Sequence, residues 1–342
     1  MARSLAELVA LPGWLTKEAT MSTQTEIGSP AKGHLRRHFW QRLGFQEAVE
    51  GYTFALPAIL GLLIFTIGPI VVSLYFSFTE YNIVKPPEFK GLANYQRLFS
   101  DGLAHRSLAI TAYYAFLAIP LSILIGFLIA LLMNQKVRGV YLYRTIWYLP
   151  ALVPAVATGT LWRYALNRDF GLVNIPFRVL GLDAPGWLID PRLTVPALVL
   201  IHLWGLGNAV LIYLAGLQGI PQHLYEAAEI DGANWWQKFW HVTVPMSSSI
   251  IFFNLIMGII GALQVFTEVY VIFTPTGGEG SVGPQNAALV YLIYLYRNAF
   301  QYFRMGYAAA LAWVLFLIIG ILTALMFRLQ RRWVYYEGER AR

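Results

Sequence analysis

The sequence predicts an all-α integral membrane protein with six transmembrane helices. Of its 342 residues, 57% are hydrophobic and 13% are charged, whereas soluble domains carry about 25% charged residues. Six apolar runs are each long enough to cross roughly 30 Å of hydrocarbon at about 1.5 Å per residue. The 11 Trp, 20 Tyr and 21 Phe are typical of the aromatic belts that anchor spans at both membrane interfaces.

Composition and motifs exclude several classes of function. The chain has no Cys, so neither a disulfide framework nor a thiolate metal site is expected, and no metal ligand is predicted. The net charge of +7 is spread over tails and loops, which favours a basic membrane protein over one that binds nucleic acid. No catalytic residue is predicted, because H-E-x-x-H and G-x-S-x-G are absent. Gly277–Gly280 lacks the Lys of a phosphate-binding loop, so the chain is not expected to hydrolyse ATP.

The first 51 residues are polar and are predicted to form a largely disordered cytoplasmic segment. They contain a basic cluster at Arg36, Arg37 and Arg42. They lack an apolar core and a small-residue cleavage site, so they do not resemble a cleaved signal peptide. Met21 is a second candidate start.

The six predicted spans follow this segment in order. They are Phe54–Phe78, Leu108–Met133, Thr145–Leu166, Leu193–Leu217, Ile250–Thr274 and Gly306–Phe327. Prolines inside the first four are tolerated in membrane helices and are expected to kink them. These prolines are Pro57, Pro69, Pro120, Pro150, Pro154 and Pro196.

The placement of Lys and Arg predicts the orientation. The short loop after the second span carries Lys136, Arg138 and Arg144 and no acidic residue, and three arginines directly follow the last span. Cytoplasmic loops are enriched in these residues. Six spans with both termini inside place residues 226–245, between the fourth and fifth spans, in the cytoplasm.

Residues 226–245 read EAAEIDGANWWQKFWHVTVP and are predicted to form a helix–turn–helix elbow in water. The first residues are strong helix formers. Gly232 is expected to end that helix, because glycine adopts a positive φ cheaply. A second short helix then places Trp236, Phe239 and Trp240 on one face, which we expect to pack against the cytoplasmic ends of the spans. An ordinary amphipathic surface hairpin is the alternative.

The elbow resembles the EAA loop of permease subunits in binding-protein-dependent ABC importers. That loop is marked by Glu-Ala-Ala, a Gly after three residues, then Ile-x-Leu-Pro after nine more. The matching residues here are Glu226, Ala227, Ala228, Gly232, Val242, Val244 and Pro245. The resemblance implies contact with an ATPase subunit through Glu226, Ala227, Ala228, Asp231, Gly232, Ala233, Trp236, Phe239 and Pro245. The carboxylate of Glu226 could instead cap its own helix.

Three other segments extend the resemblance over residues 52–332, leaving 1–51 and a cytoplasmic tail at 333–342 outside it. They are Phe89–Tyr95, Leu166–Asn174 and Leu214–Pro221. They are most similar to the carbohydrate branch, with its maltose, lactose and glycerol-3-phosphate permeases.

The resemblance implies a set of partners and a location. A second similar permease, two copies of a cytoplasmic ATP-binding subunit and an extracytoplasmic solute-binding protein would join this chain in the cytoplasmic (inner) membrane of a prokaryote. ATP and Mg would be bound by the partner ATPase, and this chain would hold no cofactor. A sugar is the expected solute, with membrane lipid and no nucleic acid as further partners. The alternatives are a polyol or glycerol-phosphate solute, or a stand-alone secondary transporter. A secondary transporter would need ionisable residues at mid-depth, but Arg163 and Glu268 are expected near the outer end.

Polar residues in the fourth and fifth spans are candidates for the sugar path. They are His202, Asn208, Asn254, Gln264 and Glu268. Amides pair with sugar hydroxyls, and Trp204, Tyr213 and Phe266 supply flat aromatic faces nearby. Hydrogen bonds between helices, worth about 0.6 kcal/mol on average, are the alternative role for each.

Contact positions of maltose-type relatives fall mainly on small or apolar residues here, so the resemblance leaves the solute open. The complete predicted path is His202, Leu206, Asn208, Gly258, Gly261, Ala262, Gln264 and Val265.

Overall fold

The structure is a computed structural model that describes residues 43–135, 138–273 and 281–335. These residues are mostly helical, and their strands are a two-residue antiparallel pair, β1 (Thr79–Glu80) and β2 (Glu88–Phe89). The predicted all-α class is therefore confirmed. The lead-in up to residue 42, the loop residue Lys136, the stretch Gly277–Gly280 and the tail beyond 335 lie outside the described residues.

The chain divides into two units, Met1–Ile64 and Phe65–Arg342. In the first unit, α1 (Leu43–Leu62) begins earlier than the predicted span and continues through Pro57. A π-helical turn, η2 (Leu63–Ile67), leads into α2 (Gly68–Ser77), which has Pro69 in its first turn. Because Glu47–Ser77 is one helical stretch, Pro69 lies inside it, and a local π-helical turn is one of the adjustments that accommodate a proline in a membrane helix.

Within the described residues, four helical stretches are long and apolar enough to cross a membrane: Glu47–Ser77, Gly102–Met133, Ser248–Phe273 and Met305–Gln330. The fourth predicted span is a bent pair, α8 (Pro191–Trp204) and α9 (Gly207–Gln218), whose axes differ by 50°. The pair makes a fifth span if it is counted as one. The apolar membrane architecture is thus confirmed, while the number of six spans stays a prediction.

The third predicted span, Thr145–Leu166, is not one continuous helix. It consists of α5 (Val140–Tyr148), a 3₁₀ turn η3 (Leu149–Leu152) and α6 (Ala155–Ala165). Val153 is extended, with φ −75° and ψ 127°, and Pro154 follows it. Proline disfavours the helical conformation of the preceding residue and has no N–H to donate. The expected kink is therefore a break.

The helix α4 (Gly102–Met133) is central to the second unit. Asp101 caps its start by accepting hydrogen bonds from the backbone N–H groups of Leu103 and Ala104. α4 packs against α8, α9, α13 (Ser248–Leu263) and α15 (Tyr291–Tyr296). Small buried side chains let these helices approach closely; on α4 they are Ala104, Ser107, Ala115, Ala118, Ser122, Gly126 and Ala130.

Two apolar cores lie among these helices. The larger core joins α4, α8, α13, α14 (Thr267–Phe273), α15 and α16 (Met305–Gln330). The second core lies between α4 and α9. Its buried members are Phe127, Ala130, Met133, Leu206, Val210, Tyr213, Leu214 and Leu217.

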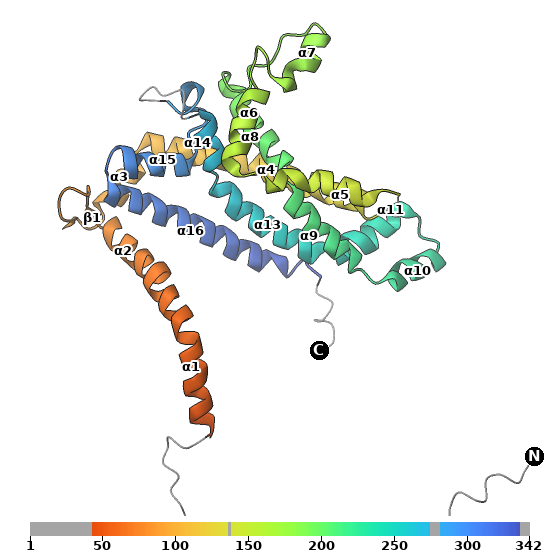
Figure 1. Ribbon diagram of the computed structural model, residues 1–342, viewed down its shortest axis with the longest axis horizontal. Coiled ribbons are helices and arrows are strands. Elements are labelled where there is room, and N and C mark those ends of the chain that lie inside the picture. The colour runs from red at the N-terminus through yellow and green to blue at the C-terminus, as the bar shows by residue number, and fades with distance from the viewer. Residues whose placement is uncertain (1–42, 136–137, 274–280, 336–342) are drawn as a thin grey trace, which may run out of the picture. The chain divides into compact units, whose positions relative to one another are not determined.

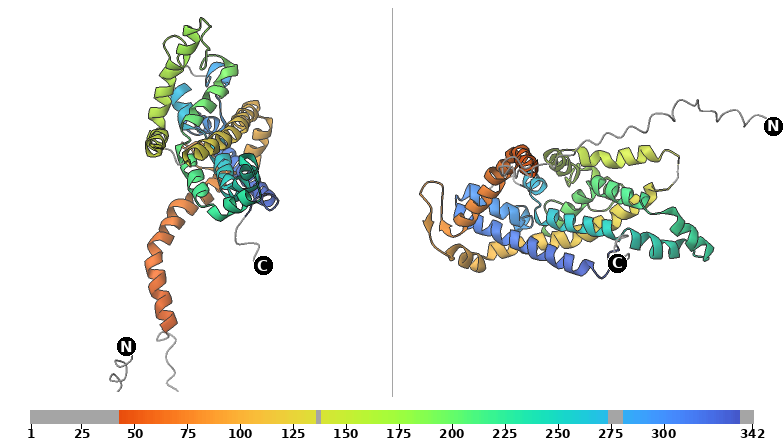
Figure 2. Two further views of the ribbon diagram at one scale, coloured as in Figure 1. Left: turned by 90° about the vertical axis from the view of Figure 1, so that its right-hand side faces the viewer. Right: turned by 90° about the horizontal axis from the view of Figure 1, so that it is seen from below.

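Shorter elements complete the second unit. They are α3 (Ala93–Ser100), η4 (Leu172–Asn174), α7 (Ile175–Val179), α10 (Gln222–Ile230), α11 (Trp235–Lys238), η5 (Phe239–Thr243), α12 (Val244–Met246), η6 (Pro284–Asn286) and η7 (Arg297–Gln301). Figures 1 and 2 show α10 and α11 at one end of this unit, with β1 and α3 at the opposite end.

Candidate functional site

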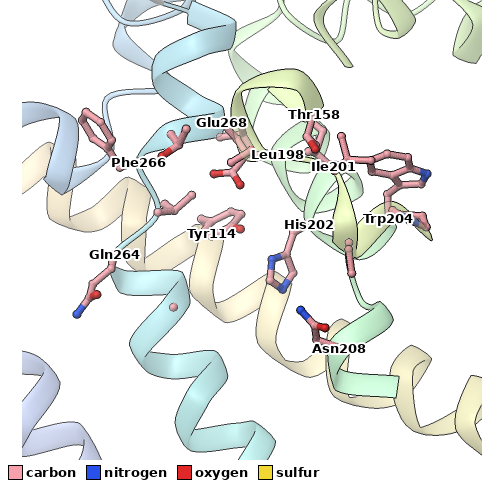
Figure 3. A pocket seen from close by; sticks show the side chains of 18 residues that line it. Tyr114, Thr158, Leu198, Ile201, His202, Trp204, Asn208, Gln264, Phe266 and Glu268 are labelled. Carbon is pink, nitrogen blue, oxygen red and sulfur yellow. The ribbon is translucent and has the colours of Figure 1, made fainter. Parts of the chain in front are cut away.

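A cavity of about 430 Å³ lies between helices of the second unit (Figure 3). Its wall combines hydrogen-bonding and aromatic side chains from α4, α6, α8, the start of α9 and the segment 261–268. The polar ones are Tyr114, Thr158, His202, Asn208, Gln264, Thr267 and Glu268, and the further aromatic ones are Trp204 and Phe266.

Two breaks in the membrane helices form much of this wall. α8 ends at Trp204 and α9 begins at Gly207, so His202 and Asn208 lie on either side of the bend. α13 ends at Leu263 and α14 begins at Thr267, which leaves Gln264 in the linker, across the cavity from His202 (Figure 3). Irregular backbone at membrane depth is tolerated where it lines a cavity.

Close packing favours glycine at the first bend. A Cβ on Gly207 would lie 3.0 Å from the Cβ of Ala151 and 3.1 Å from the carbonyl oxygen of Trp147. Contacts this short mean that a side chain here would require the neighbouring backbone to shift by a few tenths of an ångström. Gly207 therefore lets the start of α9 pack directly on η3 and α5, at the edge of the cavity.

The structure brings five residues of the predicted sugar path to the cavity wall: His202, Asn208, Gly261, Gln264 and Val265. It does not bring the other three there. Leu206 is buried in the second core and Ala262 in the larger core, while a Cβ on Gly258 would face Ile119 at 3.6 Å. These three positions serve helix packing.

Two residues that line the cavity come from spans that the sequence did not connect with it. Tyr114 lies on α4 and Thr158 on α6. The ring of Tyr114 meets His202 edge-on at 6.2 Å between centroids, a contact that no local pattern predicts. Tyr213, grouped with the cavity aromatics from sequence, is 1% exposed in the second core instead.

The elbow has the predicted helix–turn–helix conformation. α10 ends at Ile230, and Gly232 has a φ of +78°. The Asn234 side chain accepts a hydrogen bond from the backbone N–H of Gln237 at 2.9 Å, and the Gln237 side chain accepts one from the N–H of Asn234 at 2.7 Å. This capping box starts α11.

Glu226 does not cap its own helix. α10 begins at Gln222, so Glu226 lies inside the helix, where it accepts a hydrogen bond from the Gln222 side chain at 3.0 Å. Glu229 forms an ion pair with Lys238 at 2.7 Å, which links α10 to α11. The capping role considered for Glu226 is thereby excluded.

The aromatic face of the elbow divides between the protein and its surface. Phe239 packs against the second core, with its ring centroid 6.4 Å from that of Phe127. Trp236 and Trp240 are 59% and 58% exposed and stack on each other. The prediction that all three pack against the spans is therefore right for Phe239 and wrong for the two tryptophans.

A hollow of about 320 Å³ lies in the elbow. Four of the predicted coupling residues line it: Ala228, Asp231, Gly232 and Ala233. The turn at Gly232 brings them together, because it reverses the chain between α10 and α11. Pro245 lies further on, in the first turn of α12.

The sequence matches a known family across both sites. The model of the family described as "Binding-protein-dependent transport system inner membrane component" matches residues 122–335, a range that contains the elbow and most of the cavity wall. The chain belongs to this family. The resemblance inferred from the elbow is confirmed, and the chain is an inner-membrane permease.

Individual relatives cover most of this permease. It is 38% identical over 297 residues to the probable ABC transporter permease protein YesP of Bacillus subtilis (strain 168), covering 86% of this chain and 94% of that one. It is 33% identical over 285 residues to the lactose transport system permease protein LacF of Rhizobium radiobacter, covering 82% and 93%.

A solved structure has the same fold. It is a crystal structure of a bacterial ABC transporter involved in the import of the acidic polysaccharide alginate. The match has a TM-score of 0.74 at 25% identity and covers 84% of this chain and 97% of that one.

Proposed function

We propose that this permease conducts a sugar through the cavity at the two helix breaks, driven by ATP hydrolysis in other subunits. A second similar permease completes the pore, two cytoplasmic ATP-binding subunits dock on the elbows, and an extracytoplasmic binding protein delivers the sugar. ATP and Mg are bound by the ATPase subunits, and this chain holds no cofactor. The observation that carries the proposal is the cavity wall, which combines amides and hydroxyls with aromatic rings in a chain of this family.

The wall suits a sugar chemically. Amide, hydroxyl and imidazole groups donate and accept hydrogen bonds, as sugar hydroxyls do; Asn208, Gln264 and His202 supply them. The rings of Trp204 and Phe266 offer apolar faces for the C–H surface of a pyranose. The names of the relatives agree, because LacF belongs to a lactose transport system.

The alternatives receive less support. Glycerol phosphates are disfavoured because Glu268 contributes a carboxylate and no Lys or Arg stands among the described residues of the wall. A neutral polyol fits the same groups and stays the second candidate. A stand-alone secondary transporter is disfavoured by the family, whose description specifies a binding-protein-dependent system.

Co-purification and solute binding test this proposal. An affinity-tagged chain, extracted from its native membranes in mild detergent, should bring with it an ATPase and a second permease. The binding protein encoded for the same system should bind a sugar in a calorimetric panel of neutral sugars, polyols and glycerol phosphates. Recovery of the chain alone as an active transporter, or binding of glycerol phosphates in preference to sugars, would overturn it.

A further inference from the structure

One helix, α4, contacts three places that lie far apart in the molecule. Its 32 residues cover roughly 48 Å at about 1.5 Å per residue. Asp101 stands at its start, Tyr114 lines the cavity, and Phe127 meets the elbow near its end. The helix is continuous throughout, although Pro120 lies inside it.

At the contact with the elbow, Phe127 is buried and Phe239 is partly buried. Phe127 is 7% exposed and lies between Phe239 of the elbow and the edge of Tyr213 on α9, whose ring centroid is 5.6 Å away. A Cβ on Gly126 would lie 3.3 Å from the ring of Tyr213, so the neighbouring position also leaves little free space. A displacement of Phe239 must therefore move Phe127 or break this packing, since close-packed interiors transmit strain.

The elbow itself is held together as one body. The Tyr225 hydroxyl and the Thr243 hydroxyl are 3.0 Å apart, which joins α10 to η5, and the ion pair between Glu229 and Lys238 joins α10 to α11. Trp236 and Trp240 remain largely exposed. Of the three aromatic residues that the sequence placed on this face, Phe239 is therefore the one that reaches the second core.

The other two contacts of α4 lie at the cavity and at its start. Tyr114 is 3% exposed and meets His202 of α8 edge-on. At the start, one oxygen of the Asp101 carboxylate accepts hydrogen bonds from the hydroxyls of Tyr294 on α15 and Tyr307 on α16, the latter at 2.6 Å. The guanidinium carbon of Arg97 lies 4.8 Å from the centre of the Tyr307 ring. A shift of α4 therefore reaches the cavity wall and the far end of the bundle together.

From this geometry we propose that α4 transmits the movement of the elbow to the cavity wall, with Phe127 as the positioning residue that receives it from Phe239. The proposal rests on the proposed function, since it assumes an elbow moved by an ATPase. Phe127 lines neither the cavity nor the hollow of the elbow. Its role is to hold the elbow and α4 in register, so that ATP hydrolysis and sugar movement stay linked.

The test is a double-mutant cycle on the complete transporter in proteoliposomes. The variants are Phe127→Ala, Phe239→Ala and both together, and the readout is sugar taken up per ATP hydrolysed. Each single change should lower this ratio about fivefold or more while the ATPase stays bound. The double variant should be no worse than the worse single one, because both remove the same contact. Phe116→Ala is the matched control, since Phe116 lies on α4 but is 74% exposed, and its ratio should be unchanged.

Several results would overturn the inference. They are a wild-type ratio in Phe127→Ala, fully additive losses in the double variant, or an equal loss in Phe116→Ala. If the alanine variants do not assemble, the same measurement is made on Phe127→Leu and Phe239→Leu. Leucine keeps an apolar side chain in place, so these variants are expected to assemble. Each should lower the ratio about twofold, and wild-type ratios in both would contradict the role. Failure of the wild-type complex to move sugar with ATP would instead contradict the proposed function.

Discussion

Gly232 shows how a single residue sets the shape of the elbow. Its φ of +78° lies in the left-handed region, yet a Cβ there would meet nothing within 4 Å. Glycine is therefore needed for backbone conformation and not for space. A side chain in this region costs about 1–2 kcal/mol, and proline is incompatible because its φ is fixed near −65°.

We expect Gly232→Pro to abolish ATP-driven uptake while the protein still inserts into the membrane. Proline would remove the N–H that donates to the carbonyl of Glu229 at 3.0 Å and would re-aim α11. Glu226→Ala, which removes an exposed carboxylate from α10, should weaken ATPase binding without changing the fold. Uptake, membrane content and ATPase co-purification are the measurements. Normal uptake by Gly232→Pro would refute the coupling role of the elbow.

The second prediction for single residues concerns three side chains of the cavity wall: His202, Asn208 and Gln264. Replacing each by Leu removes a hydrogen-bonding group from the cavity wall, so uptake should fall by about tenfold or more for at least one of them, with the ATPase still bound. Asn254→Leu is the control, since Asn254 does not line the cavity and donates to the carbonyl of Ile250 in its own helix. Unchanged apparent affinity in all three variants would assign these residues to helix packing.

At the scale of elements, the Asp101 carboxylate joins α4 to α15 and α16. Burial alone would raise the pKa of Asp101, but the hydrogen bonds from Tyr294, Tyr307 and two backbone N–H groups outweigh it and hold the pKa below its ordinary value of 3.8. A pKa that is lower in the folded state stabilises the fold at pH values above 3.8, and this contribution is lost as the pH falls through the folded value.

Asp101→Asn should therefore lower the thermal unfolding midpoint of the purified complex near neutral pH, and the difference from wild type should shrink as the pH falls below about 4. Asparagine keeps the helix cap but loses the charge-assisted bonds to the tyrosines. Asp190→Asn is the control, because Asp190 caps α8 through the N–H of Arg192. A difference that does not change with pH would show that the charge on Asp101 is not what matters.

Some features of the helices and turns could be predicted from the sequence, and others could not. The turn at Gly232 and the kink before Pro154 follow from the conformational limits of single residues, so both were predictable, although the kink is a full break. The contact of Tyr114 with His202 joins α4 to α8 and depends on how distant helices pack. The exposure of Trp236 was also beyond prediction, because spacing identifies an apolar face but not which surface covers it.

For the whole molecule, the central question is which end of the bundle faces the cytoplasm. The placement of Lys and Arg predicts that both termini and the elbow are inside. We expect an impermeant thiol reagent applied to intact cells to label Glu88→Cys and not Gln135→Cys or Gln237→Cys. Because the chain has no native Cys, the introduced Cys is the one thiol that each variant offers to the reagent. Labelling after permeabilisation is the control. Reaction of Gln237→Cys in intact cells would reverse the topology.

The most direct test of the account is whether this permease works as part of an ATP-driven sugar importer with the predicted orientation. The complete complex is reconstituted into proteoliposomes, with ATP and Mg on one side of the membrane and the sugar-loaded binding protein on the other. Uptake of labelled sugar should require both, on opposite sides, and should stop when a non-hydrolysable ATP analogue replaces ATP. Uptake that continues without ATP, driven by a proton or sodium gradient alone, would contradict the account.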